Sequence, residues 1–303
     1  MTTYALVTAI GFSLMLGCGL ILPFLSFRDR WRAHAEHRSL FDKSARQLEL
    51  LQTLILALVS VLLCADLLCG GRIYAAMQGV WAWNFLGICI LCGAAAILSF
   101  LALFASRQAA RWISTATCLV SIVPLGAGLV CASHWLAGGG AFADTAPLAA
   151  PQDIIRLLTG QHAALFFCIL AFLLAASLAL ACVAALCWPV VCRLKADYGR
   201  DFYTLMLGRR AQLAWKAILL LIAASAALLY VSPSLSPCWA ALLRSCCGGY
   251  GAYPAYGSLA FLPLAAFLCH AVAVHPVPMQ RKSLAFLSLL TLCAGIAAAA
   301  LHI

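Results

Sequence analysis

The chain has 303 residues, of which 65% are hydrophobic and only 9% are charged. So few charged side chains cannot cover the surface of a water-soluble protein of this size, whereas helices surrounded by lipid need no such cover, and a soluble domain is therefore excluded. The net charge of +10 does not indicate nucleic-acid binding, because the basic residues cluster in short segments between apolar ones, a pattern typical of membrane topology signals.

Apolar runs of about 20 residues, the length that crosses a bilayer as a helix, recur along the whole chain. We expect an all-α integral membrane protein with eight transmembrane helices over residues 4–26, 48–69, 82–105, 112–136, 162–191, 213–231, 257–276 and 283–302. Sustained alternation of apolar and polar residues, which would predict strands, is absent from the sequence. The first helix is expected to be retained, because no basic region precedes it and no small-residue cleavage site follows it.

The segments that connect these helices alternate in basic character. Four of them are rich in Lys and Arg, namely residues 28–46, 107–111, 193–216 and 281–282. The other connections hold only Arg72, Arg156 and Arg244. Because Lys and Arg gather on the cytoplasmic side of a membrane, we expect both chain termini to be extracytoplasmic. The prediction is a multi-pass protein of the bacterial inner membrane.

Two of the basic segments, residues 28–47 and 193–212, have the same length, and each ends in Gln followed by Leu at the start of a new apolar helix. This similarity predicts two four-helix bundles, an N-terminal half over 1–137 and a C-terminal half over 162–303, joined by an extracytoplasmic connector over 138–161. An even number of helices in each half makes the internal duplication a parallel one. Independent halves with similar connections are the alternative.

The connection between the second and third helices carries most of the candidate site residues. Asp66 stands in the last turn of the second helix and is followed by Arg72, and Trp81, Trp83 and Asn84 surround the start of the third helix. Ionisable residues near a membrane span are costly and are therefore functional candidates. Two interpretations stay open: a polar cavity or ion pair, or side chains that emerge among lipid headgroups with the tryptophans as interfacial anchors.

Three histidines are further candidates. His134 closes the fourth helix and His162 opens the fifth, so both are expected at the outer interface. They are interpreted as ordinary interfacial histidines, as quinone-contacting or proton-handling groups, or as the axial ligands of a haem, which needs two histidines facing each other across a bundle. His270 lies within the seventh helix, where it either belongs to a proton path or is a neutral histidine bonded to a neighbouring helix.

The 16 cysteines lie mostly inside apolar runs, where cysteine behaves as a small hydrophobic residue. Cys238, Cys246 and Cys247 differ, because they fall in a connection rich in Pro, Gly and Tyr that is predicted to be extracytoplasmic. A disulfide from Cys238 to one of the other two is an open alternative there. No metal site is expected, and no phosphate-binding, zinc-protease or nucleophile-elbow motif occurs, so no catalytic residue is predicted.

The stretch from Asp66 to Asn84 resembles the membrane-anchor subunits of polysulfide reductase and dimethyl-sulfoxide reductase. The elements that carry the resemblance are an acid at the end of the second helix, a glycine turn, an arginine, an aromatic residue and a tryptophan-rich helix start: Asp66, Gly70, Gly71, Arg72, Tyr74, Trp81, Trp83 and Asn84. The plan of eight helices with both termini outside is also similar. The resemblance implies a subunit without a metal that holds a quinone, menaquinone or ubiquinone, at the outer membrane face and exchanges electrons with an iron–sulfur partner and further redox subunits.

That role is compatible with the side chains present. A quinone needs an apolar slot, aromatic walls and hydrogen-bonding groups that also pass protons. Trp81, Trp83 and Asn84 supply walls and a donor, and Asp66, His134 or His162 takes the proton. The first hypothesis is a quinone-interacting membrane anchor of a multisubunit respiratory oxidoreductase; the alternatives are a b-type cytochrome with haem b on the two outer histidines, and a membrane transporter built from duplicated halves.

Overall fold

The computed structural model of the protein describes residues 3–36, 39–68, 82–137, 163–193, 198–231 and 253–300. Within these ranges the chain forms eight α-helices and one short 3₁₀ helix, η2 (Pro278–Arg281), and no strand. The helices are α1 (Thr3–Ala35), α2 (Ser39–Leu68), α4 (Ala82–Phe104), α5 (Arg107–Ala137), α7 (Ala163–Cys192), α8 (Arg200–Val231), α10 (Tyr253–Val274) and α11 (Lys282–Ala300). Each expected helix has a counterpart, and the predicted all-α class is confirmed.

Six of the described helices are long and apolar enough to cross a bilayer: α2, α4, α5, α7, α8 and α11. A shorter apolar stretch, Ala260–Val274, lies in α10. By helix length and composition the chain is a multi-pass membrane protein. The full count of eight spans stays a prediction.

Several helices continue well beyond the apolar runs from which they were predicted. α1 ends at Ala35 instead of residue 26, α2 begins at Ser39 instead of residue 48, and α8 begins at Arg200 instead of residue 213. Arg, Lys, Gln and Glu are good helix formers, so a helix does not end where its hydrophobicity ends. With 30 residues, α2 is about 45 Å long and exceeds the hydrocarbon thickness of about 30 Å. The basic segments predicted as connections are therefore largely helix ends.

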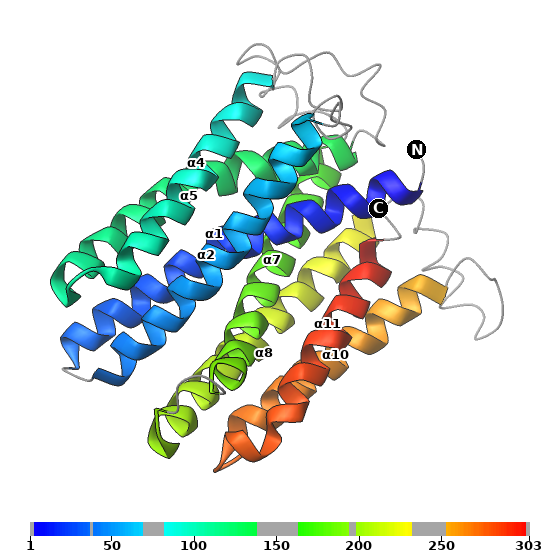
Figure 1. Cartoon of the computed structure of the whole chain (residues 1–303). Helices are drawn as coiled ribbons and strands as arrows, with labels where there is room; N and C mark the ends of the chain where they lie inside the picture. Colours follow the sequence, from blue (N-terminus) through cyan, green and yellow to red (C-terminus); the bar gives the residue numbers. More distant parts are fainter. Residues whose placement is uncertain are drawn as a thin grey trace.

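The helices run alternately up and down (Figure 1). The end of α1 and the start of α2, and likewise the facing ends of α4 and α5, α7 and α8, and α10 and α11, lie at one end of the bundle, and the start of α1 and the end of α11 lie at the other. All described Lys and Arg residues lie at the first of these ends or in the adjoining parts of the helices, and we call this the basic end. Which side of the membrane it faces stays a prediction of the positive-inside rule.

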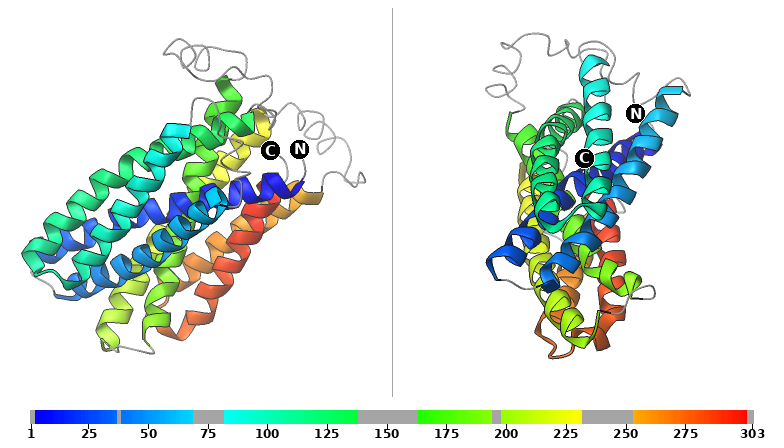
Figure 2. Two further views of the ribbon diagram at one scale, coloured as in Figure 1. Left: turned by 45° about the horizontal axis from the view of Figure 1, so that its top comes forward. Right: turned by 60° about the vertical axis from the view of Figure 1, so that its left-hand side comes forward.

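The helices pack in two groups that adjoin one another (Figure 2). In the first group α1 and α4 both pack against α2 and α5; in the second, α7 packs against α8, α8 against α10 and α10 against α11. α7 also packs against α1 and α5 and joins the groups. The boundaries of the predicted halves and their duplication stay predictions, and the connector over 138–161 lies outside the described residues.

The contact between α1 and α7 depends on a glycine. A Cβ atom at Gly17 would lie 2.2 Å from Oγ of Ser177 on α7, a distance that two such atoms do not adopt. Small residues at a helix interface allow two backbones to approach closely, which in lipid is a main source of attraction between helices. Ala181 and Ala185 of the same helix α7 are buried in one cluster with Cys18 of α1. The two helix groups are thus joined along a narrow seam of small side chains.

Candidate functional site

The residues predicted at the outer interface lie at helix ends opposite the basic end. Asp66 is in the last turn of α2, Trp83 and Asn84 are in the first turn of α4, and His134 is in the last turn of α5. The backbone of these turns is described and their side chains are not. The other three predicted residues of this site, Arg72, Trp81 and His162, lie outside the described residues, as do the three cysteines of the predicted disulfide, Cys238, Cys246 and Cys247.

His270 lies on an exposed face of α10. Its ring meets the ring of Trp215 on α8 edge to face, with centroids 5.3 Å apart and an interplanar angle of 75°. The imidazole therefore contacts a neighbouring helix at the outside of the bundle. A role in a proton path stays a prediction. Among the described residues no group of His, Cys, Asp and Glu is placed to hold a metal ion.

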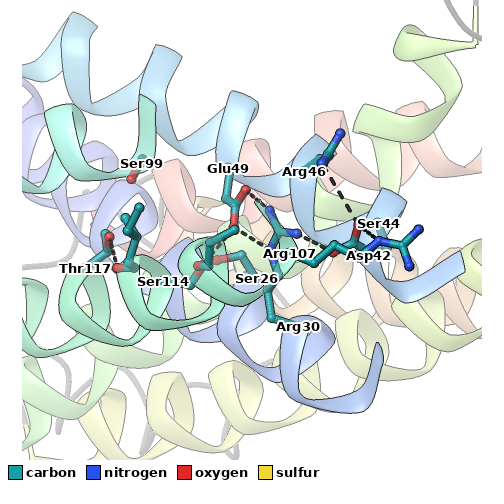
Figure 3. Close-up of polar contacts among 12 residues, drawn as sticks. Ser26, Arg30, Asp42, Ser44, Arg46, Glu49, Ser99, Arg107, Ser114 and Thr117 are labelled. Carbon is teal, nitrogen blue, oxygen red and sulfur yellow. Dashed lines mark hydrogen bonds and ion pairs between the residues drawn. The ribbon is translucent and has the colours of Figure 1, made fainter. Parts of the chain in front are cut away.

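A cluster of buried charges lies near the basic end, between α1, α2 and α5 (Figure 3). Arg30 of α1 is 3% exposed and Glu49 of α2 is 1% exposed. Nε of Arg30 donates to Oε1 of Glu49 at 3.0 Å, and Nη2 donates to Oε2 at 2.7 Å. This is the bidentate geometry in which arginine and a carboxylate form their strongest hydrogen bonds. We call the set of four residues the Arg30 cluster: Arg30, Glu49, Asp42 and Ser114.

Asp42 and Ser114 satisfy the remaining polar atoms of the pair. Nη1 of Arg30 donates to Oδ1 of Asp42, one turn from the start of α2. Oγ of Ser114 on α5 donates to Oε1 of Glu49 at 2.8 Å. Buried ions are tolerated only when they are paired and hydrogen-bonded in this way. Arg30 lies beyond the predicted first span. Burial alone would lower the pKa of its guanidinium. The hydrogen bonds and negative charges of Glu49 and Asp42 outweigh burial and raise that pKa above its ordinary value.

Exposed arginines surround the outer side of the cluster. Arg107 at the start of α5 approaches Oδ2 of Asp42 to 3.7 Å, and Arg46 approaches the same atom to 4.0 Å. Two carboxylates and one guanidinium give the buried part of the cluster a net charge of −1, which these rim arginines more than balance. The cluster is thus a buried acidic centre inside a basic rim (Figure 3).

A second chain of hydrogen bonds connects the two helix groups, and we call it the Arg210 bridge. Arg210 of α8 is buried; its Nη2 donates to Oγ of Ser44 on α2 at 2.7 Å, and its Nη1 donates to the carbonyl of Ala185 on α7 at 2.7 Å. The Ser44 hydroxyl in turn donates to Oδ2 of Asp29 on α1 at 2.5 Å. The Ser44 hydroxyl therefore connects Arg210 of the second helix group to Asp29 of the first by two hydrogen bonds.

Polar side chains continue from the Arg30 cluster into the first helix group. Gln52, one turn beyond Glu49 on α2, donates from its amide nitrogen to Oγ of Ser99 on α4. The other amide atom, Oε1 of Gln52, and Oγ of Ser121 on α5 are buried without a hydrogen-bond partner among the described residues. Buried polar atoms of this kind are uncommon in folded proteins. The interior of α2, α4 and α5 is therefore polar for more than one helical turn.

A cavity of about 480 Å³ opens at the basic end beside the Arg30 cluster. Its lining includes three arginines, one acid, one histidine and one amide: Arg30, Arg107, Arg111, Asp42, His34 and Gln108. The cavity brings together α1, α2 and α5, the same three helices that form the cluster. Its size falls within the range of small-ligand pockets.

Sequence reasoning missed the cluster because it assigned the basic segment over 28–46 to a connection with a topological role only. A signal was present. Four of the nine acidic residues of the chain fall between positions 29 and 49, namely Asp29, Glu36, Asp42 and Glu49. Glu49 lies inside the predicted second span and shares a helix face with Asp42, since the two positions are separated by about two helical turns. An acid at that position is costly unless it has a buried partner.

No protein-family model, no curated protein and no solved structure matches this chain.

Proposed function

We propose that the chain is a quinone-interacting membrane anchor of a multisubunit respiratory oxidoreductase, which exchanges electrons between the membrane quinone pool and an iron–sulfur partner subunit. One observation carries the proposal. Asp66 is at the end of α2, Trp83 and Asn84 are at the start of α4, and His134 is at the end of α5. α4 packs against both α2 and α5, and these three helix ends lie opposite the basic end (Figure 1). The resemblance of the stretch from Asp66 to Asn84 to known anchor subunits supports the same role.

The proposed site divides its tasks among side chains of different chemistry. Trp81 and Trp83 form aromatic walls for the quinone ring, and Asn84 donates a hydrogen bond to a quinone carbonyl. Asp66, with His134 or His162, takes the proton that leaves when a quinol is oxidised, or supplies it when a quinone is reduced. The electrons pass to the partner subunit. Arg72 balances the charge of Asp66 at the rim.

Lateral access from lipid is also compatible with the packing of α4. Ile90 and Ile97 lie on the exposed face of this helix, which is among the most apolar in the chain. A quinone with a long hydrocarbon tail reaches its site from the bilayer, so the tail needs an apolar surface next to the headgroup site. α4 supplies that surface directly beneath the turn that bears Trp83 and Asn84.

The test is a pair of substitutions in membranes that contain the assembled complex. Asp66→Asn and His162→Gln are each expected to lower quinol oxidation by about a hundredfold or more, the usual effect of losing a proton-handling group. Asp201→Asn, an exposed acid at the start of α8 at the basic end, is the matched control and should leave turnover unchanged. Reduction of the partner by a water-soluble donor should be normal in all three. Unchanged quinol turnover in both site variants would overturn the assignment of the site.

Two measurements separate this proposal from its alternatives. Purification in mild detergent should recover an iron–sulfur subunit with the chain. An absorption spectrum of the purified chain should lack a Soret band; a band that disappears in His134→Ala and His162→Ala would replace the proposal by a b-type cytochrome.

A transporter is the second candidate, and the buried polar interior of the first helix group favours it. Glu49 and Gln52 lie within a stretch of α2 that is apolar enough to span a membrane, and ionisable residues in such places often mark ion pathways. Proteoliposomes that contain the chain without a partner would show proton or solute uptake if this candidate is correct. Uptake that is lost in Glu49→Gln would favour the transporter over the anchor.

A further inference from the structure

The cavity at the basic end presents positive charge that the protein itself does not neutralise. Asp42, the acid in its lining, is already paired with the buried Arg30. Arg107 meets Asp42 only at 3.7 Å, and its side chain is 76% exposed. Arg111 forms no ion pair with a carboxylate among the described residues. Its Nε atom is buried and has no hydrogen-bond partner among those residues. Asp42, the one carboxylate in the lining, is therefore shared by Arg30, Arg46 and Arg107, and Arg111 has no carboxylate partner among the described residues.

Aromatic rings hold Arg111 in position. Its guanidinium lies over the ring of Trp31 on α1 at 5.3 Å and over the ring of Trp112 on α5 at 5.6 Å. Contacts of this kind stabilise the cation and fix its plane without using its hydrogen-bond donors. An arginine that is restrained in this way is prepared for a planar, bidentate contact with the oxygens of a phosphate.

The same two tryptophans indicate the depth of the cavity in the membrane. Trp31 is 42% exposed and Trp112 is 59% exposed, and exposed tryptophans concentrate at the level of the lipid headgroups. α4 packs against α5 and ends at the basic end, where its exposed side chains Phe100 and Phe104 meet edge to face and form an apolar surface. The basic end thus offers a cavity with arginines for a polar group and, on the helix packed against α5, an exposed apolar surface.

We infer that this cavity binds the phosphate of an anionic phospholipid, with the headgroup between Arg107 and Arg111 and the acyl chains along the exposed face of α4. A phosphodiester supplies an acceptor for Arg111, which has no carboxylate partner among the described residues, and a further one for Arg107, which shares Asp42 with two other arginines. The acyl chains would lie against the exposed phenylalanines of α4. Free phosphate shares the headgroup chemistry but would leave the apolar wall unused. The inference is independent of the proposed quinone function, because it concerns the opposite end of the helices.

The test uses the full purified chain after exchange into a detergent free of anionic lipid. Phosphatidylglycerol should bind to it and raise its unfolding temperature, whereas phosphatidylcholine and inorganic phosphate at matched concentration should not. The double variant Arg107→Gln with Arg111→Gln should bind phosphatidylglycerol about tenfold more weakly or worse, because each basic residue near a headgroup contributes to the attraction. Binding is counted directly by native mass spectrometry.

A matched control separates the cavity from the general charge of this end. The double variant Arg200→Gln with Arg281→Gln removes two exposed arginines outside the cavity and should retain full binding. Arg107→Lys keeps the positive charge and should retain most of the phosphatidylglycerol binding. This variant shows whether the loss in the glutamine variant is due to the charge and not to a folding defect. Equal losses in the two glutamine pairs, equal binding of phosphatidylcholine, or full competition by inorganic phosphate would each overturn the inference.

Discussion

Arg30 on α1 holds both carboxylate oxygens of Glu49 on α2, at 3.0 and 2.7 Å, although the two residues are 19 positions apart. Two parallel hydrogen bonds between rigid planar groups fix the rotation of one helix against the other. Such a pair costs desolvation, and its clearest effect on a fold is to select one packing among several. We therefore expect this pair to set the register between α1 and α2.

Removing one partner of that pair should be severe. Glu49→Ala leaves the Arg30 guanidinium buried with Asp42 as its remaining acid, and we expect the free energy of unfolding to fall by about 3–5 kcal/mol. Arg46→Ala is the control, because Arg46 is 47% exposed and lies 4.0 Å from Asp42, and exposed ion pairs contribute about 1 kcal/mol or less. Denaturation in detergent measures both. Similar losses in the two variants would contradict the account of the pair.

A glycine substitution tests the seam between the two helix groups. Gly17→Ala would place a Cβ atom 2.2 Å from Oγ of Ser177, so the helices must separate, and we expect a loss of about 1–3 kcal/mol. Gly93→Ala on α4 is a matched control, since a Cβ atom added there would meet no described atom within 4 Å, and alanine should be neutral or stabilising because it favours the helix. If both variants unfold at the same temperature, α1 and α7 do not meet at this glycine.

A double-mutant cycle measures the Arg210 bridge. Arg210→Met and Ser44→Ala should each destabilise the protein, and the double variant should lose less than the sum, with a coupling of about 0.5–3 kcal/mol. Arg210→Met combined with Thr117→Val supplies the control, because the Thr117 hydroxyl bonds to Ile113 of its own helix. That pair should be additive. Additive losses for Arg210 and Ser44 would show that the relay contributes no stability.

Fusions to topology reporters test the orientation of the basic end. Alkaline phosphatase is active only outside the cytoplasm, so a fusion after Ile303 should be active and an insertion after Ser106, in the turn between α4 and α5, should be inactive. A fluorescent protein that folds only in the cytoplasm should give the reverse pattern. The opposite pattern would invert the predicted topology, and activity at both sites would contradict the prediction that the two positions lie on opposite sides of the membrane.

Hydropathy predicted the helices well because a bilayer imposes a length on every apolar run. It did not predict where α2 and α8 begin, since hydropathy reports contact with lipid and not the extent of the hydrogen-bonded helix. The pairing of Arg30 with Glu49 was beyond reach for a different reason: it depends on how two helices are rotated about their axes, and a single sequence does not contain that angle. The outer residues Asp66 and His134 were predicted from their positions near helix ends, and those positions agree with the backbone.

The hydroxyl of Ser44 has consequences for how the chain can be divided. Its single proton points to Asp29, so its lone pair faces Arg210, and the acceptor for a buried cation of one helix group is supplied by the other. If the chain is cut between α5 and α7, the fragment that contains α7 to α11 keeps only the Ala185 carbonyl as an acceptor for the Arg210 guanidinium. We therefore expect the two fragments to be stable in detergent only when they are produced together, so that the whole chain unfolds as one cooperative unit.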